Sequence, residues 1–305
     1  MGGGQPRIHV GPRPVPELEK AVIRGGGRLS PLRDAEGLVY YGNDDPGELG
    51  SMIHPWLRWV QLPHAGVERW SEAGLITDDR IWTCASGAYG PAVAEHALAL
   101  MLAAARHLHV CIRGKAWDST KRTRMFAGST VGVIGTGGIG RALIDMLAPF
   151  RCTVLAVSDA GPVVGAAATF PRAAYREVLP QSDYVVLAAP STPRTRGMIA
   201  SPELHAMRRG AWLVNVARGD LVDTDDLVDA LRTGLIAGAA LDVTAPEPLP
   251  TEHPLWRMSN VILTPHCANP TNAYWQGLAD RVTKNVRQLA AGATLEGVVR
   301  PSTGY

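Results

Sequence analysis

A glutamate held between two prolines is the first feature of this sequence that points to chemistry. Glu247 lies in "LDVTAPEPLP" (241–250), with Pro246 before it and Pro248 after it. Each proline fixes its own φ and drives the preceding residue into an extended conformation. Proline-rich loops are common, so stiffness alone does not establish a function. It does raise the question of which partner requires a rigidly placed carboxylate.

Three further ionisable residues each lie at or just beyond the end of an apolar, strand-like run. They are Arg218 in "VNVARGDLVD", Asp242 in "LDVTAPEPLP" and His266 in "ILTPHCANP". Taken singly, an arginine after a strand is usually part of a surface ion pair, and such a histidine is usually a capping or core residue. The carboxyl ends of parallel strands open onto a ligand crevice, so their joint occurrence with Glu247 indicates a site.

A glycine-rich turn supplies the strongest local motif. In "VGVIGTGGIGRAL" an apolar strand runs into Gly135, Gly137 and Gly140 with the spacing G-x-G-x-x-G, and a helix follows. The first glycine makes the tight turn, the second lets the backbone approach a pyrophosphate, and the third packs the helix against the strand. The helix N-terminus then offers unpaired N–H groups to phosphates. In this strand-turn-helix context the motif predicts dinucleotide binding.

The end of the next strand bears on the choice between NAD and NADP. Ser158 stands where an acidic residue would bind the adenosine ribose, and Asp159 is one position further on. A serine tolerates a 2′-phosphate, but the stretch "VSDAG" contains no arginine to bind one, and Asp159 would repel it. The sequence therefore favours NAD.

These residues need a parallel sheet to bring them together. Six apolar runs with helical segments between most of them predict a doubly wound sheet. The runs are 129–135, 153–158, 183–189, 211–216, 236–243 and 260–265.

The first ninety residues predict a second α/β unit. Their strand-like runs are 7–10, 37–41, 58–62 and 80–84. An apolar helix, 91–109, then leads into the cofactor domain, and an amphipathic helix, 272–292, ends at Gly292 and can return to the first unit. We thus expect two domains: residues 1–90 with 272–305 for the substrate, and 91–271 for the dinucleotide.

Composition excludes several other classes of protein. With 30 basic and 28 acidic residues the net charge is +2, which indicates neither nucleic acid nor anionic membrane as a partner. The basic run Lys121–Arg124 is predicted to be a solvated loop. Four scattered cysteines argue against a disulfide framework and a structural zinc site, so no metal is expected. The N-terminus resembles no signal peptide, and no apolar run could span a bilayer, which favours a cytoplasmic protein.

Taken together, the motifs resemble the D-isomer-specific 2-hydroxyacid dehydrogenase family over nearly the whole chain. "SGAYGPAVAEHALALML" is similar to the family's domain-entry helix, "GTGGIG" to its cofactor loop, and the Arg, Glu and His stretches match in order and spacing. The resemblance implies a Rossmann cofactor domain inserted in a flavodoxin-like substrate domain. It also implies a homodimer, formed through the helix that begins near Pro91.

The resemblance further implies a set of catalytic roles. Arg218 would bind the substrate carboxylate and polarise the adjacent carbonyl, because its planar fork makes two-point contacts. His266 would donate the proton to the nascent alkoxide. Glu247 would hold the His266 ring and favour the imidazolium, which is a reason to fix this carboxylate between prolines.

Other residues are assigned to ligands by the same resemblance. Asp242 would accept from the nicotinamide carboxamide, or would merely cap a turn. The remaining cofactor-lining residues would be Gly138, Ile139, Pro190, Ala217 and Ala268, together with His266. In "LPHAGVERW" (62–70), backbone N–H groups of Ala65 and Gly66 would bind the substrate carboxylate. His64 and Tyr89 could face the substrate, and Trp70 and Trp275 could wall the cleft or be plain core.

These expectations favour an NAD(P)H-dependent reductase of small 2-keto acids such as glyoxylate or hydroxypyruvate. Several alternatives remain open. The chain ends soon after its last helix, which lowers the case for phosphoglycerate. Glu247 argues against formate, for which the family pairs the histidine with glutamine. Phosphite oxidation keeps the same triad, and an NADH-sensing corepressor branch of the family also keeps it. A Rossmann methyltransferase is disfavoured by the Arg, Glu and His set.

Overall fold

The structure is a computed structural model that describes residues 4–114, 117 and 123–300. The chain divides into two compact units, Met1–Tyr89 with Pro270–Tyr305, and Gly90–Asn269. Lys121 and Arg122 of the predicted basic loop lie outside the described residues. Among the described helices, none is long and apolar enough to cross a membrane.

The first unit is a five-stranded parallel sheet with the order β2-β1-β3-β4-β5. Its strands are β1 (Arg7–Pro12), β2 (Arg28–Leu29), β3 (Gly37–Tyr41), β4 (Trp59–Gln61) and β5 (Ile81–Thr83). Its helices are α1 (Pro16–Arg24), η1 (Leu32–Asp34), α2 (Pro46–Met52), α3 (Glu68–Glu72) and α9 (Thr271–Ala291). The two-residue strand β2 was not predicted, because so short a run carries no alternation to detect.

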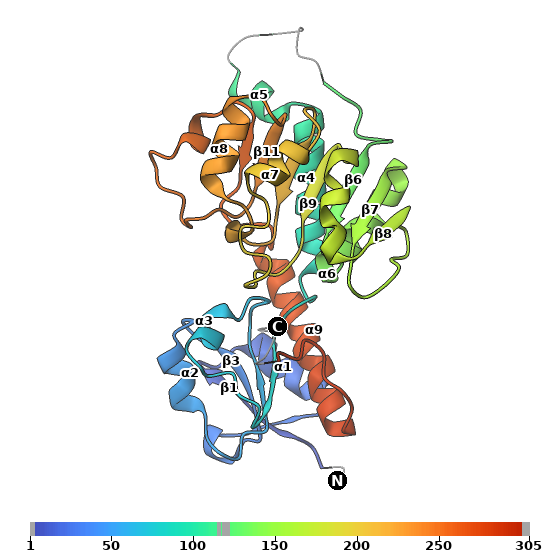
Figure 1. The fold of residues 1–305 in the computed structure, drawn as a ribbon. Helices are drawn as coiled ribbons and strands as arrows, with labels where there is room; N and C mark the ends of the chain where they lie inside the picture. The colour runs from blue at the N-terminus through green and yellow to red at the C-terminus, as the bar shows by residue number, and fades with distance from the viewer. Residues whose placement is uncertain (1–3, 115–116, 118–122, 301–305) are drawn as a thin grey trace. The chain divides into compact units, whose positions relative to one another are not determined.

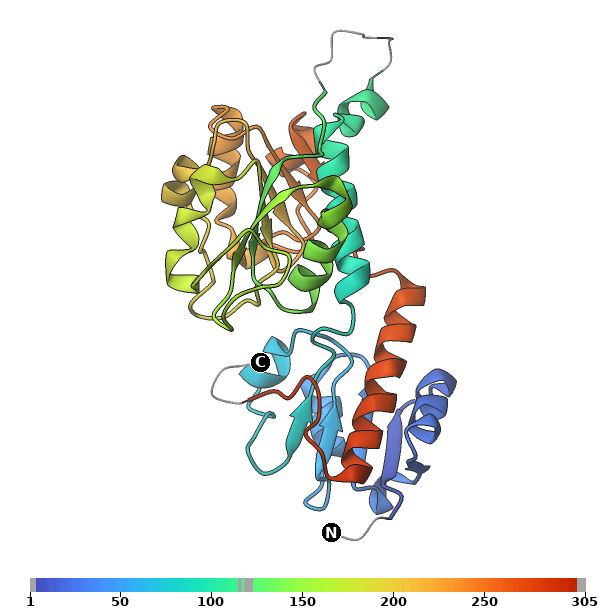
Figure 2. The same cartoon turned by 90° about the vertical axis from the view of Figure 1, so that its right-hand side faces the viewer.

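The C-terminal helix α9 belongs to this first unit. It lies beside α1 (Figures 1 and 2), and Thr283 Oγ1 donates to the carbonyl oxygen of Ala21 at 3.2 Å. A Cβ at Gly25 would lie 2.7 Å from the Thr283 carbonyl oxygen, so the glycine permits this close helix packing. Gly292 ends the helix at φ 65°, as its position in the sequence predicted.

The second unit is a seven-stranded parallel sheet with the order β12-β11-β10-β9-β6-β7-β8. Its strands are β6 (Thr130–Ile134), β7 (Thr153–Val157), β8 (Ala168–Phe170), β9 (Tyr184–Leu187), β10 (Trp212–Asn215), β11 (Gly238–Leu241) and β12 (Val261–Leu263). Six of these were predicted. The edge strand β8 was missed because its three residues are only half buried and show no apolar run.

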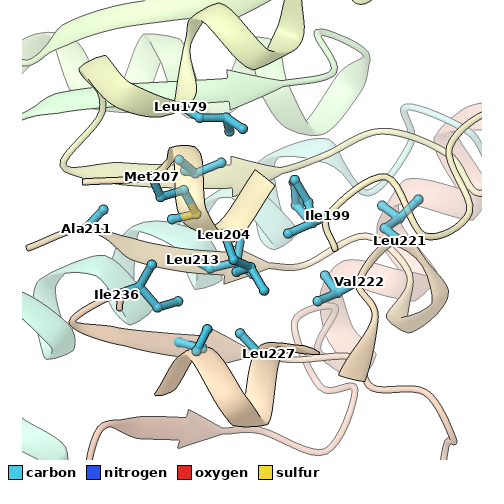
Figure 3. Packing of buried hydrophobic residues seen from close by; sticks show 14 of the residues in the cluster. Leu179, Ile199, Leu204, Met207, Ala211, Leu213, Leu221, Val222, Leu227 and Ile236 are labelled. Carbon is cyan, nitrogen blue, oxygen red and sulfur yellow. The ribbon is translucent and has the colours of Figure 1, made fainter. Parts of the chain in front are cut away.

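Helices cover both faces of the second sheet. The helices of this unit are α4 (Gly90–Ala105), α5 (Leu108–Arg113), α6 (Gly138–Leu147), α7 (Ser201–Ala206) and α8 (Thr224–Arg232). Its 3-10 turns are η2 (Ala148–Phe150), η3 (Arg172–Glu177), η4 (Leu179–Gln181), η5 (Gly219–Leu221) and η6 (Pro254–Arg257). In Figure 2, α4 and α6 lie on one face and α8 lies on the other. Leu204 of α7 and Leu227 of α8 pack on Leu213 of β10 in a buried cluster (Figure 3).

The strand order of each sheet defines its class of fold. Numbered from β6, the second sheet has the doubly wound 3-2-1-4-5-6 order with one added strand, and the first has the flavodoxin-like 2-1-3-4-5 order. The predicted fold class, two parallel-sheet α/β domains of which one is a Rossmann domain, is confirmed. In open parallel sheets of both kinds, ligands bind at the loops that follow the strands' carboxyl ends.

Candidate active site

The predicted ionisable residues gather at the carboxyl edge of the second sheet. Strands β10, β11 and β12 are neighbours paired in parallel. Arg218 follows β10, Asp242 follows β11 and His266 follows β12. Parallel pairing therefore brings residues far apart in sequence to one edge of the unit.

The structure joins Glu247 and His266 directly. Glu247 Oε1 lies 2.6 Å from Nδ1 of His266, and the two side chains are 42% and 52% exposed. His266 has φ 50°, a left-handed conformation that a non-glycine residue adopts at a cost of about 1–2 kcal/mol. Its N–H donates to the carbonyl oxygen of Asp242 at 2.8 Å, which holds the backbone in this conformation. The imidazole is thus oriented through both its backbone and its ring.

The segment that carries Glu247 is braced on both sides of Pro246. Thr244 Oγ1 donates to the Pro246 carbonyl oxygen at 2.9 Å, and Thr224 Oγ1 donates to the Ala245 carbonyl oxygen at 2.7 Å. The peptide bonds that precede Pro246 and Pro248 are both cis. The rigid carboxylate inferred from the two prolines therefore also has specific hydrogen bonds behind it.

The loop that carries Arg218 is held by a residue that the sequence analysis missed. Asn215, which is 1% exposed, donates from Nδ2 to the Arg218 carbonyl oxygen at 2.8 Å and accepts at Oδ1 from the Ala217 N–H at 3.1 Å. Arg218 itself is half buried, and its Nη1 donates to the Ala217 carbonyl oxygen at 2.8 Å. An asparagine closing the apolar run "WLVN" was the available signal, because a buried amide must find partners.

The Arg218 and Glu247 loops touch through their backbones. A Cβ built on Gly219 would lie 2.0 Å from the carbonyl carbon of Thr244, so only glycine fits here. The arginine and the glutamate are therefore carried by adjoining loops, although 29 positions separate them in sequence.

Asp242 binds its own chain. Its carboxylate accepts from Thr264 Oγ1 at 2.6 Å and from the N–H groups of Cys267 and Ala268 at 3.0 and 3.1 Å. His96 Nε2 lies 3.4 Å away. Burial raises the pKa of Asp242, but these hydrogen bonds outweigh burial and hold it at about 2. The carboxylate thus anchors the segment 264–268 that presents His266, and neither His96 nor Thr264 was found from the sequence.

The glycine turn has the shape that the motif predicts. Gly135 has φ 99°, and a Cβ on it would lie 2.7 Å from the Ala188 backbone. A Cβ on Gly140 would lie 2.1 Å from the Gly135 carbonyl oxygen. A Cβ on Gly137, by contrast, would meet no heavy atom of the described residues within 4 Å. The first and third glycines are required for packing, and the second leaves open space before α6.

These residues fit a dinucleotide. The open space lies at the N-terminus of α6, where backbone N–H groups can bind a pyrophosphate. Gly138 and Ile139 form the first turn of that helix. The other predicted lining residues follow neighbouring strands at the same edge of the sheet: Pro190 after β9, Ala217 after β10 and Ala268 after β12.

The end of β7 differs from the sequence-based expectation in one respect. The stretch "VSDAG" contains no arginine, but Arg172, which follows β8, reaches Asp159: its backbone N–H donates to Oδ1 at 2.9 Å and its Nε lies 3.2 Å from Oδ2. Arg176 and Arg194 also line the adjoining cavity of about 560 Å³. The edge strand β8, which the sequence did not reveal, is the element that brings this arginine to Asp159.

The first unit holds the predicted substrate loop, between β4 and α3. Ala65 is exposed and Gly66 half buried, whereas Trp70 is core at 2% exposure. Tyr89 donates to the Pro63 carbonyl oxygen at 2.6 Å, so its hydroxyl supports this loop. His64 pairs with Asp44, and Trp275 packs against Tyr41 with ring centroids 4.9 Å apart.

Comparisons with known proteins agree with this architecture. Residues 98–268 match the family described as "D-isomer specific 2-hydroxyacid dehydrogenase, NAD binding domain". A Corynebacterium melassecola protein, described as uncharacterized, is 39% identical over 95% of this chain and 97% of its own. The human "Glyoxylate reductase/hydroxypyruvate reductase" is 36% identical over 67% of this chain and 63% of its own length.

A solved structure extends the similarity to the whole chain. The crystal structure of a D-isomer specific 2-hydroxyacid dehydrogenase from Xanthobacter autotrophicus Py2, in complex with NADPH and MES, is 28% identical with a TM-score of 0.84 and 99% of each chain covered.

Fold and comparisons together define the class of protein: an NAD(P)-dependent oxidoreductase that acts on the CH–OH group. The chain belongs to the D-isomer specific 2-hydroxyacid dehydrogenase family, as the motifs predicted.

Proposed function

We propose that this protein interconverts a small 2-keto acid and its D-2-hydroxy acid with a nicotinamide cofactor. The observation that carries the proposal is the 2.6 Å contact between Glu247 and His266 at the sheet edge that also presents the glycine turn. A hydrogen-bonded carboxylate–imidazole pair suits proton transfer to a carbonyl oxygen. The names of relatives, glyoxylate reductase among them, support this class of substrate.

The roles of the chain's residues follow from their contacts. With Nδ1 bonded to Glu247, the imidazolium has Nε2–H available to protonate the carbonyl oxygen in reduction, and neutral Nε2 accepts that proton in the reverse reaction. Glu247 orients the ring through Nδ1. Arg218 binds the substrate carboxylate with its planar guanidinium. The nicotinamide supplies or takes the hydride.

We assign cofactor binding to the second unit. The turn Gly135–Gly140 and the N-terminus of α6 would hold the pyrophosphate, and Ser158 with Asp159 the adenosine ribose. The Asp242 carboxylate already accepts hydrogen bonds from Thr264, Cys267 and Ala268, so it would bind the nicotinamide only through its remaining oxygen lone pairs. Backbone N–H groups of Ala65 and Gly66, in the first unit, would bind the substrate carboxylate.

We propose a preference for NAD over NADP, based on the Asp159 carboxylate at the end of β7. This side chain is 55% exposed and would repel a 2′-phosphate. Asp159→Ser should release Arg172 for that phosphate and raise kcat/KM with NADPH about 10-fold, a gain near the strength of one charge-assisted hydrogen bond. Asp145→Asn, on the exposed side of α6, is the matched control. A wild-type enzyme that prefers NADPH would contradict the assignment.

The decisive test is turnover. Purified protein should oxidise NADH or NADPH in the presence of glyoxylate, hydroxypyruvate, pyruvate or a bulkier 2-keto acid, measured as loss of absorbance at the nicotinamide band. The product should be the D-enantiomer, identified by chiral chromatography. Tight NADH binding with no turnover across this panel would contradict the proposal and favour a sensing role.

We also propose a homodimer formed through α4 and the residues that follow it. Ile112, Trp117 and Met125 are large apolar side chains exposed at 82%, 99% and 79%. Several large exposed apolar side chains on one stretch of chain favour an interface there. Light scattering should give twice the chain mass, and Ile112→Asp should shift the protein toward monomer, whereas Ile23→Asp, on the exposed surface of α1, should not. A wild-type monomer at micromolar concentration would contradict this.

A further inference from the structure

A second histidine–carboxylate pair lies at the carboxyl edge of the first unit's sheet. Strands β3 and β4 are parallel neighbours, so the loops that follow them emerge side by side. Asp44 is on the first of these loops and His64 on the second. His64 Nε2 lies 3.0 Å from Oδ1 and 3.1 Å from Oδ2 of Asp44. The side chains are 40% and 31% exposed, so the pair is open to a ligand.

The other acidic residues near Asp44, namely Asp45 and Glu48, form hydrogen bonds within this loop and α2. Asp45 caps α2 by accepting from the Gly47 N–H at 2.9 Å. Glu48 accepts from Tyr40 Oη at 2.8 Å and from the Asn43 N–H at 3.0 Å. Asp44 makes its side-chain hydrogen bonds with His64 alone among the described residues. Its carboxylate is therefore dedicated to the imidazole.

The Asp44 backbone has a left-handed φ of 59°, which aspartate adopts more readily than most residues with a side chain. The half-exposed contact with His64 contributes little to stability. Its clearest consequence is that the His64 ring is held in one orientation.

Aromatic rings hold His64 in one orientation. Its ring stacks on the core residue Trp70, with centroids 6.2 Å apart and planes at 15°. Tyr274 of α9 lies 6.1 Å away and stacks on Tyr89 at 5.2 Å. Tyr41 and Trp275 extend this wall, with centroids 4.9 Å apart. The imidazole thus stands at the margin of a half-buried aromatic surface.

One nitrogen of this ring is left for a ligand. Nε2 donates to Asp44, and in the part of the chain that the structure describes Nδ1 has no hydrogen-bond partner. Nδ1 is an acceptor in the neutral ring and a donor in the imidazolium. A hydroxyl group both donates and accepts, so it can pair with either form. His64 also directly precedes Ala65 and Gly66, to which we assign the substrate carboxylate.

We propose that His64, oriented by Asp44, is a subsite for a hydroxyl group on C3 of the substrate, which makes 3-hydroxy-2-keto acids the preferred class. This rests on the function proposed above. A site that hydrogen-bonds a substrate hydroxyl rejects the analogue that lacks it, because its polar groups are then left unpaired.

Hydroxypyruvate and pyruvate differ by that one hydroxyl and test the subsite in turnover. Wild type should favour hydroxypyruvate in kcat/KM by about 10²-fold or more. His64→Ala should bring the ratio to within about 10-fold through loss of hydroxypyruvate activity, with pyruvate activity retained. Asp44→Asn should lower the ratio by a smaller factor. His54→Ala, in a half-buried histidine of the same unit, is the matched control and should leave the ratio unchanged.

Binding of the products separates this proposal from the proposed function. D-Glycerate and D-lactate differ by the same hydroxyl, and their dissociation constants in the presence of NADH follow from quenching of nicotinamide fluorescence. Tighter binding of D-glycerate that depends on His64 supports the subsite even if no keto acid is turned over. Equal affinity for the two acids, or a preference unchanged in His64→Ala and Asp44→Asn variants with native circular dichroism, overturns it.

Discussion

The two histidine–carboxylate pairs use the same side-chain chemistry in opposite ways. In the second unit Glu247 holds Nδ1 of His266, and in the first unit Asp44 holds Nε2 of His64. The ring nitrogen left for a ligand is therefore different in each. The left-handed residue is the histidine at 266 and the carboxylate at 44, with φ 50° and 59°.

Surroundings decide what each pair can do. His266 pairs with Glu247, whose loop adjoins the loop that carries Arg218, and it stands at the edge that presents the glycine turn, so we assign the proton transfer to it. His64 belongs to a unit without that turn and stands among aromatic rings, so we assign it to substrate selection rather than to proton transfer. A histidine–acid contact by itself therefore does not identify a catalytic centre.

The largest predicted effect is a loss of kcat in a His266 variant, and it distinguishes His266 from His64. His266→Ala should lower kcat by about 10²–10⁴-fold for every 2-keto acid, because it removes the proton donor. Affinity for NADH, measured by fluorescence titration, should be spared. His205→Ala, in an exposed histidine of α7, serves as control. A kcat within about threefold of wild type would reject His266 as the proton donor.

Arg218→Lys should have the next largest effect. An ammonium group cannot make the two-point contact of a guanidinium, and one charge-assisted hydrogen bond is worth about 1.5–3 kcal/mol. KM for the keto acid should therefore rise about 10–100-fold, measured by steady-state kinetics at saturating NADH. Arg232→Lys, in an exposed arginine of α8, should leave KM unchanged. An unchanged KM in the Arg218 variant would remove this residue from the substrate site.

Asp242→Asn tests how the His266 segment is anchored. The pKa of Asp242 is about 2 against an ordinary 3.8, which corresponds to about 2 kcal/mol of stability. Because the folded-state pKa is lowered, this contribution is present above about pH 4 and is lost as the pH falls toward 2. Urea unfolding at pH 7 should show the loss in the variant, and the difference from wild type should narrow at pH 3.

The control for that stability measurement is Asp229→Asn, which replaces an acidic side chain of α8 that is 77% exposed. A difference between wild type and Asp242→Asn that is the same at pH 7 and pH 3 would mean that the carboxylate's charge is not what anchors the segment.

Glu247→Gln should have the smallest effect on rate. Glutamine can still accept from Nδ1 of His266, but a neutral amide makes a weaker hydrogen bond than a carboxylate, so kcat for keto-acid reduction should fall by about 10-fold in steady-state kinetics. Glu252→Gln, in an acid that pairs with exposed Arg257, should leave kcat unchanged. A kcat equal to that of wild type in Glu247→Gln would show that the charge of this carboxylate is not needed.

Local chemistry allowed the sequence by itself to determine much of this protein. Local sequence features limit the backbone conformation of each segment. The glycine spacing predicted the dinucleotide turn, the apolar runs predicted the sheets, and the two prolines predicted a rigid Glu247. His64 was singled out as well, but its partner was not, because Asp44 lies on a different loop and no local rule links the two.

Only the tertiary structure decided which side chains meet. Arg172 on Asp159, and His96 with Thr264 on Asp242, join segments that only the fold brings together. Hydrogen bonds between distant segments leave no periodicity in a sequence, since they depend on parallel strands ending at a common edge. The candidate catalytic residues could thus be recognised from local sequence motifs, whereas most residues that hold them in place were identified only from the structure.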